Sequence, residues 1–262
     1  MPMAQTPNQD GLNAGSANTE VAPARSSALA KLDIWKQCER LALNKKTLAK
    51  NRVISANRTD EAYKSFDMLR TRLLQVLSEK KWGRVAITSP TAGCGKTFVA
   101  TNLAFSMARL ASCRTILMDM DLRNPGIADI LGAEQTSDMQ EFLEGDIAPE
   151  DFLMKVTDNF VVGLNDQPTD VAAEILQESM TEDVLIDMQD GFYPTAVLYD
   201  LPPALDNDDV IGFLPNVDGV LIVAGGGMTT AAEIRKVEQM LGKHTPVLGV
   251  ILNRAEAPIW GE

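Results

Sequence analysis

The sequence is poor in the residues that build zinc clusters and histidine-based catalytic sites. Its 262 residues include a single histidine, His244, and three cysteines, Cys38, Cys94 and Cys113, which are scattered and never in CxxC spacing. A cysteine-rich zinc site and a catalytic triad that uses histidine as its base are therefore disfavoured.

A surplus of basic charge and long apolar runs are lacking as well. The chain has 24 Lys+Arg against 36 Asp+Glu and a formal net charge of −12, which argues against a broad nucleic-acid-binding surface. No run approaches the roughly 20 apolar residues of a membrane-spanning helix, and the first residues lack the basic and apolar regions of a signal peptide. We therefore expect a soluble cytoplasmic protein that binds no nucleic acid and keeps its thiols reduced.

Composition divides the chain into three parts. Residues 1–30 hold few large apolar side chains, so this N-terminal tail is expected to be disordered. Residues 31–58 carry eight basic and two acidic residues and are expected to form a basic, helical segment. Either this helix is simply solvated, or it docks on anionic lipid or an acidic partner. Residues 59–262 are expected to form one domain.

Helical and strand patterns alternate in that third part. Apolar side chains at helical spacing predict a helix that contains Phe66, Leu69, Leu73, Leu74 and Leu77. Short apolar runs predict buried strands at residues 84–89, 115–121, 159–164, 195–200, 219–224 and 246–253. Buried strands separated by helices indicate an α/β fold, in which a mainly parallel sheet has helices on both faces.

The segment SPTAGCGKT, residues 89–97, lies between an expected strand and an expected helix. A glycine-rich loop at this place directs backbone amides at an anion, beside the positive end of the helix dipole. Lys96 is expected to reach the β- and γ-phosphates of a nucleotide and the Thr97 hydroxyl to bind Mg²⁺. Pro90 departs from the strict P-loop pattern, which has glycine there. The residues expected to hold the nucleotide phosphates are Gly93, Cys94, Gly95, Lys96, Thr97 and Phe98.

Three aspartates follow expected strands at the sheet edge where α/β proteins gather their ligands. Asp119 and Asp121 lie in MDMDLRNP, two residues apart and so on the same side of an extended chain, and Asp200 lies in YDLPP. Magnesium bound to a nucleotide needs hard oxygen ligands, and carboxylates beside the loop would supply them.

Taken in order, SPTAGCGKT, ILMDMDLRNP, AVLYDLPP, DGVLIVA and PVLGVILNR resemble the bacterial tyrosine kinase family. These are P-loop NTPases of the deviant-Walker class that belong to capsule and exopolysaccharide systems. The resemblance covers about residues 61–254, and its most specific part is the DxDLRxP motif at residues 119–125.

The resemblance implies a function and roles for individual residues. Lys96, Asp119 and Asp121 would be catalytic, with Asp119 as the base or as the group that orients the nucleophile. Thr97, Asp121 and Asp200 would hold Mg²⁺. ATP or ADP would bind with its adenine near Asn253 and Arg254. The resemblance further implies ATP phosphoryl transfer beneath a membrane polysaccharide copolymerase that activates the protein. The chain would then sit peripherally at the inner face of the plasma membrane, through that partner or the basic segment, and could form homo-oligomers.

Two departures from the family leave the acceptor and the assembly open. Family members that phosphorylate themselves end in a tyrosine cluster, whereas this chain has only Tyr63, Tyr193 and Tyr199. The acceptor of the phosphoryl group is therefore water or a tyrosine. The Glu-x-x-Arg-x-x-Arg element, through which family members form rings, is degraded around residues 61–70.

Two other classes of protein stay open. A Min- or Par-type positioning ATPase shares the fold but carries a second lysine five residues before the P-loop lysine, where this chain has Thr91. A non-catalytic adaptor that only binds nucleotide would use nearly the same residues, so ATP turnover is the observation that distinguishes it.

Overall fold

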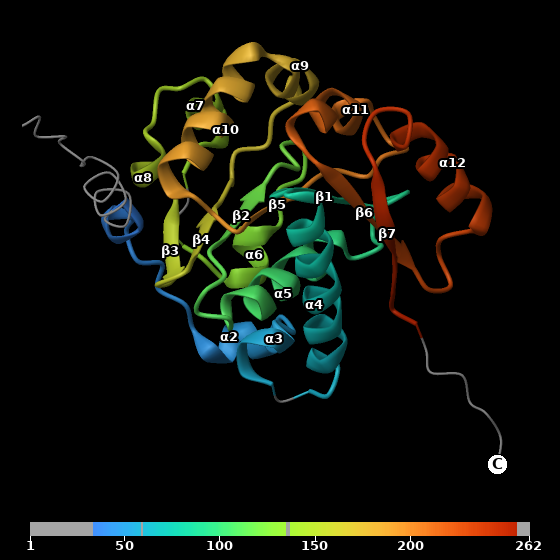
Figure 1. The fold of residues 1–262 in the computed structure, drawn as a ribbon, viewed down its shortest axis with the longest axis horizontal. Helices are drawn as coiled ribbons and strands as arrows, with labels where there is room; N and C mark the ends of the chain where they lie inside the picture. Colours follow the sequence, from blue (N-terminus) through green and yellow to red (C-terminus); the bar gives the residue numbers. More distant parts are fainter. Residues whose placement is uncertain (1–33, 59, 135–136, 256–262) are drawn as a thin grey trace, which may run out of the picture.

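The computed structural model describes residues 34–58, 60–134 and 137–255. The tail expected at residues 1–30 lies outside the described residues, as do residues 256–262. The described chain forms a seven-stranded sheet of order β3-β4-β2-β5-β1-β6-β7, with helices on both faces (Figure 1). All neighbouring strands are parallel except the antiparallel pair of β3 and β4. The predicted fold class, a mainly parallel α/β sheet, is confirmed.

The strands alternate with helices along the chain, as the sequence pattern predicts. The strands are β1 (Arg84–Thr88), β2 (Thr115–Asp119), β3 (Met154–Thr157), β4 (Phe160–Gly163), β5 (Ala196–Asp200), β6 (Gly219–Gly225) and β7 (Val247–Asn253). The helices before β3 are α2 (Lys45–Lys50), α3 (Ile54–Asn57), α4 (Tyr63–Lys80), α5 (Lys96–Ala108), α6 (Ile127–Leu131), α7 (Met139–Leu143) and α8 (Pro149–Phe152). Those after β4 are α9 (Ala172–Gln177), α10 (Ser179–Phe192), α11 (Asp209–Phe213), the 3-10 helix η1 (Leu214–Asn216) and α12 (Ala231–Leu241).

The sheet separates two hydrophobic layers. Alternate residues of each strand enter opposite layers, as Ile116 and Leu117 of β2 do. One layer lies under α7, α9, α10 and α11, and the other under α4, α5 and α6 (Figure 1). Among the described residues, no helix has both the length and the apolar character needed to cross a bilayer.

Strand β3 is absent from the sequence-based prediction. It has four residues, and only alternate ones are buried, so it shows no continuous apolar run. Residues 39–41 cover its outer edge, because Leu41 N–H donates to the Lys155 carbonyl at 2.9 Å and Lys155 N–H donates to the Glu39 carbonyl at 2.7 Å. This cover leaves less of the edge free to pair with another chain.

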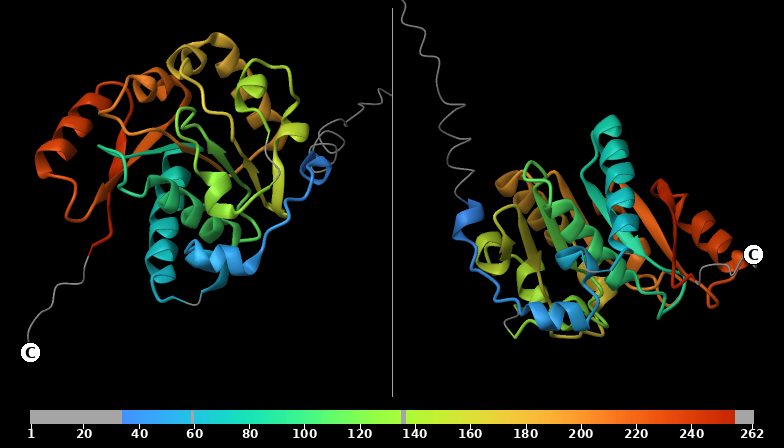
Figure 2. Two further views of the ribbon diagram at one scale, coloured as in Figure 1. Left: turned by 180° about the vertical axis from the view of Figure 1, so that it is seen from behind. Right: turned by 90° about the horizontal axis from the view of Figure 1, so that it is seen from below.

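The basic segment expected over residues 31–58 is described from residue 34. It forms short helices joined by extended chain instead of one helix, and it runs from the β3 edge to the side of α5 and α6 (Figures 1 and 2). Leu48 and Val53 enter the layer under α5, and Trp35 enters the opposite layer. Residues 34–58 therefore contribute to the core of the same body as the sheet, with their basic side chains outside.

Trp35 supplies the most direct test of that packing. Its side chain is 2% exposed, its indole N–H donates to the Phe192 carbonyl at 2.7 Å, and its ring meets the Phe192 ring edge-on. Trp35→Ala should lower the free energy of unfolding by about 3–5 kcal/mol, as measured by urea denaturation. Lys46→Ala, at an exposed position of the same segment, should change it by less than about 0.5 kcal/mol. Equal stability of the two variants would show that the segment does not pack in solution.

Candidate functional site

The loop between β1 and α5 has the backbone geometry of a phosphate-binding loop. Gly93 and Gly95 have φ of 82° and 86°, in the left-handed region that glycine adopts without strain. At Gly95 a side chain would also collide with the Asn253 amide. Because α5 begins at Lys96, its free N–H groups and the positive end of its dipole lie directly beside the loop.

Lys96 is held by a carboxylate from the segment that directly follows β2. Its Nζ lies 2.7 Å from Asp121 Oδ2, and the two side chains are 13% and 2% exposed. Burial acts to lower the Lys96 pKa, but Asp200, Asp121 and Asp119 together raise it, so the ammonium group stays charged. This largely buried cation is surrounded by the three carboxylates of Asp119, Asp121 and Asp200.

Asp119 has one oxygen engaged and one without a partner. Its Oδ2 accepts the N–H groups of Gly126 and Ile127 at 2.9 and 2.8 Å, which fixes the start of α6. Its buried Oδ1 has no hydrogen-bond partner among the described residues. Burial, followed by the nearby Asp200 charge, raises the pKa of Asp119 well above its ordinary value. A carboxylate with a raised pKa is a stronger base than an ordinary aspartate.

Asp200 stands directly opposite Asp119 in the parallel register of β5 and β2. It is fully buried, and neither of its oxygens has a hydrogen-bond partner among the described residues. Burial raises the pKa of Asp200. The positive charge of Lys96 and the nearby Thr97 hydroxyl act in the opposite direction, but burial has the larger effect. Buried, unpartnered carboxylate oxygens are costly unless a cation or donor meets them.

These orphaned oxygens fit a magnesium ion that arrives with a nucleotide. No cluster of three or more His, Cys, Asp or Glu side chains in the described part of the chain would hold a metal by itself. Magnesium in nucleotide sites takes one or two carboxylates, a hydroxyl and the substrate phosphates. Asp200, Asp121 and Thr97 match that donor set.

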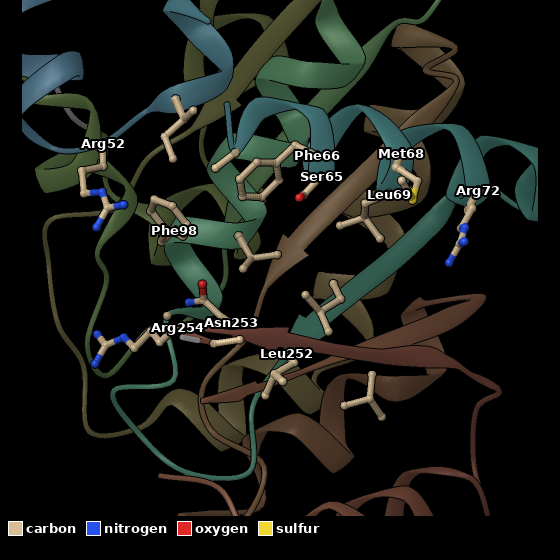
Figure 3. Close-up of a pocket in the computed structure, with 17 residues that line it drawn as sticks. Arg52, Ser65, Phe66, Met68, Leu69, Arg72, Phe98, Leu252, Asn253 and Arg254 are labelled. Carbon is tan, nitrogen blue, oxygen red and sulfur yellow. The ribbon is translucent and has the colours of Figure 1, made fainter. Parts of the chain in front are cut away.

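The expected adenine residues lie beside the loop at the end of β7. Asn253 Nδ2 donates to the Cys94 carbonyl at 2.9 Å, so this side chain already braces the loop. Arg254 has φ of 57°, and its guanidinium lies 3.6 Å from Met228 Sδ. Both line a cavity of about 750 Å³ that also contains Gly95 and Phe98 (Figure 3). The predicted site residues thus gather around one loop, while their roles stay proposals.

One contact of the site was not anticipated from the sequence. Arg123, inside the DxDLRxP motif, donates to buried Asp209 through Nε at 2.7 Å and Nη2 at 3.1 Å. Its Nη1 donates to the Asp170 carbonyl at 2.8 Å. Arg123 therefore joins the segment after β2 to α11, and its position in the motif was the only available signal.

A phosphate-binding loop with aspartates at the ends of β2 and β5 of a parallel sheet defines a P-loop NTPase. The family model described as ParA, NUBPL iron-transfer P-loop NTPase, matches residues 82–258, more than half of the chain. The chain therefore belongs to this P-loop NTPase family.

Individual relatives confirm the resemblance to bacterial tyrosine kinases. The chain is 28% identical to tyrosine-protein kinase Etk of Escherichia coli over 75% of this chain and 27% of Etk. It is 27% identical to tyrosine-protein kinase CpsD of Streptococcus pneumoniae over 70% of this chain and 81% of CpsD. The chain spans only about a quarter of the length of the first curated relatives it matches.

Solved structures show the same relationship. The kinase domain of Escherichia coli tyrosine kinase ETK superposes with a TM-score of 0.70 at 25% identity, over 80% of this chain and 84% of that one. The septum site-determining protein MinD of Pyrococcus horikoshii, complexed with Mg-ADP, gives 0.56 at 19% identity, over 67% of this chain and 74% of that one. The second likeness shows the fold alone.

Replacement of Asp200 by asparagine should stabilise the ligand-free protein. Because the folded-state pKa of Asp200 is raised, its ionisation removes stability as the pH rises through that pKa. Asp200→Asn lacks this charge, so it should gain roughly 1–2 kcal/mol at pH 8, as relief of a strained functional site commonly does, and less at pH 5. Urea unfolding at both pH values measures the difference. Asp206→Asn, at an exposed position, is the control, and a larger gain at pH 5 than at pH 8 would contradict the prediction.

Proposed function

We propose that this chain is a Mg-ATP-dependent phosphoryl-transfer enzyme of the bacterial tyrosine kinase type. The observation that supports this most is the buried group of Lys96, Asp119, Asp121 and Asp200 beside a glycine-rich loop. One cation and several incompletely satisfied carboxylates are arranged where triphosphate and Mg²⁺ would complete the charge balance.

Binding of nucleotide exchanges the partners of this group. Lys96 leaves Asp121 for the β- and γ-phosphates, which frees Asp121 to face the metal with Asp200 and the Thr97 hydroxyl. Bound Mg²⁺ supplies positive charge that neutralises the phosphate oxygens during transfer. Asn253 and Arg254 hold the adenine end, and the loop amides with Cys94 and Phe98 surround the phosphates.

Asp119 is the proposed base or orienting group. Its Oδ2 is fixed by two backbone N–H groups, so the side chain cannot rotate freely, and its unpartnered Oδ1 is left to meet the nucleophile. Preorganisation of this kind lowers the barrier because the group need not reorient during the reaction.

The acceptor of the phosphoryl group is proposed to be water or a partner's tyrosine. Tyr199 is fully buried against Phe213, so it cannot travel to a second active site. Tyr193 is 51% exposed, and Tyr63 begins α4. These two are the only tyrosines of this chain placed to serve as acceptors, and neither belongs to a C-terminal cluster.

The proposed setting is capsule or exopolysaccharide synthesis and export, beneath a membrane polysaccharide copolymerase that activates the chain at the inner face of the membrane. The resemblance to the bacterial tyrosine kinase family supports it, and tyrosine-protein kinase CpsD of Streptococcus pneumoniae is one such relative of this chain. Ring assembly is a weaker part of the proposal, because the charges of the degraded element are used within the chain. Asp67 binds Arg58 at 2.8 Å and Arg70 at 3.0 Å.

A Min- or Par-type positioning ATPase is the second candidate. The ParA family model and the fold shared with MinD favour it. Thr91, at the place of that class's second lysine, argues against it. A non-catalytic adaptor is the third, and a measured ATP turnover would eliminate it.

Lys96→Met should weaken Mg-ATP binding by ~10²-fold or more, because charge-assisted contacts with two phosphates are lost. Isothermal titration calorimetry of wild type, Lys96→Met and the surface control Lys46→Met measures this. Equal affinity in all three proteins would remove Lys96 from the site.

Asp119→Asn should reduce turnover by ~10²–10⁴-fold while nucleotide affinity changes little, because a base acts chiefly in the transition state. The protein is incubated with Mg-ATP, with and without the cytoplasmic tail of a polysaccharide copolymerase, and released phosphate and phosphotyrosine are measured together. Hydrolysis at the wild-type rate would overturn the role of Asp119. Stoichiometric phosphate on Tyr63 or Tyr193, located by mass spectrometry, would overturn the assignment of water or a partner as acceptor.

A further inference from the structure

The cavity beside the loop receives a side chain from a segment far away in the sequence. Its lining includes Gly95 and Phe98 at the start of α5, Asn253 and Arg254 after β7, and also Arg52. In Figure 3, Arg52, Phe98 and Arg254 stand at one end of the cavity, while Met68, Leu69 and Arg72 of α4 stand toward the other. The volume of about 750 Å³ lies within the range of small-ligand sites.

Arg52 is held in place through the helix that begins at the phosphate loop. Its carbonyl accepts from Asn102 Nδ2 at 3.3 Å, and the same Nδ2 donates to the Phe98 carbonyl at 3.0 Å. Asn102 Oδ1 accepts the Ser55 N–H at 3.0 Å. A single buried side chain of α5 thus fixes the backbone on both sides of Val53 relative to Phe98. The α5 helix itself therefore determines where Arg52 is presented.

The guanidinium of Arg52 is only weakly engaged. Its one ion pair among the described residues is with Asp60 at 3.9 Å, and the two side chains are 72% and 49% exposed. An exposed pair at that distance contributes little to stability. Arg52 can therefore turn from Asp60 to a bound anion or an aromatic ring at small cost.

We propose that Arg52 contacts the nucleoside end of the bound ATP or ADP, opposite Arg254. This inference rests on the proposed function, since it takes the phosphates to lie at Lys96 and Thr97. Gly95 of the loop lines the same cavity as Arg52 and Arg254, and so does Asn253, which donates to the Cys94 carbonyl of the loop. A nucleotide whose phosphates lie at the loop can therefore extend its nucleoside end into this cavity. A planar guanidinium stacks on a purine ring and also donates to ribose hydroxyls and α-phosphate oxygens.

The inference separates Arg52 from the other basic residues of its segment. Lys45, Lys46 and Lys50 of α2 are exposed and do not line the cavity. They stay available to anionic lipid or an acidic partner, whereas Arg52 belongs to the nucleotide cavity. Deletion of residues 1–58 would therefore change nucleotide affinity and would not be a clean test of membrane recruitment.

The test is calorimetric titration of the full chain with Mg-ATP, Mg-ADP and inorganic tripolyphosphate. Arg52→Ala should weaken ATP and ADP by ~10-fold, the usual size of one guanidinium stack, and leave tripolyphosphate affinity unchanged. Lys50→Ala removes the same charge two residues away and should change none of the three. Arg52→Lys keeps the positive charge and most of the aliphatic stem. It should weaken ATP binding almost as much as Arg52→Ala does, because an ammonium group is not planar and cannot stack on the purine ring.

Three outcomes would overturn the inference. The first is equal ATP affinity in wild type and Arg52→Ala. The second is a loss of tripolyphosphate affinity in Arg52→Ala as large as its loss of ATP affinity. The third is a loss of ATP affinity in Lys50→Ala as large as that in Arg52→Ala. Thermal unfolding of each variant checks that it folds normally. A loss of ATP affinity in Arg52→Lys with an unchanged unfolding midpoint supports a direct contact. Unchanged ATP affinity in Arg52→Lys contradicts the stacking. Wild type that binds neither ATP nor ADP would defeat the proposed function itself, whereas wild-type binding that survives Arg52→Ala would remove only Arg52.

Discussion

The register between β2 and β5 is the constraint on which the site depends. It sets Asp119 directly beside Asp200, and both carboxylates are fully buried. Neighbouring like charges raise each other's pKa and destabilise the folded chain. The structure offsets this with the Lys96 ammonium and with the amides at the start of α6. The carboxylate oxygens that remain without partners among the described residues, Asp119 Oδ1 and both oxygens of Asp200, are suited to the proposed magnesium ion.

The rest of the sheet serves to hold that register. Both strands are buried at every position, because helices cover the two faces and β4 and β1 flank the pair. A shift by one residue would send Ile116 and Leu117 to the wrong layers, which makes the alignment costly to lose. Hydrophobic packing of β2 and β5 therefore offsets the electrostatic cost of placing the two carboxylates side by side.

Six of the seven strands and the loop could be predicted because local sequence specifies them: largely apolar segments of six to eight residues, and a glycine-rich motif after one of them. Strand β3 could not, since four residues with alternate burial resemble a loop. The wrapping of residues 34–58 could not either. It depends on Asn102 and Lys155, which lie far away in the chain. Local motifs pointed to Asp119 and Asp200, but no local pattern shows that Arg123 binds Asp209 or that Arg52 lines the cavity beside the loop.

Residues 34–58 and the cavity beside the loop are consequently linked in energy as well as in space. Asn51 Nδ2 donates to the Asp129 and Ile130 carbonyls of α6, and Asn102 ties residues 52–55 to α5. Both helices begin at groups of the site, α6 at the amides that hold Asp119 and α5 at Lys96. A ligand that binds only the folded cavity stabilises this packing by its own binding free energy. Suppose that a surface binds the exposed lysines of α2 and shifts the segment. Its binding would change the affinity for nucleotide, and nucleotide would change the affinity for that surface by the same factor.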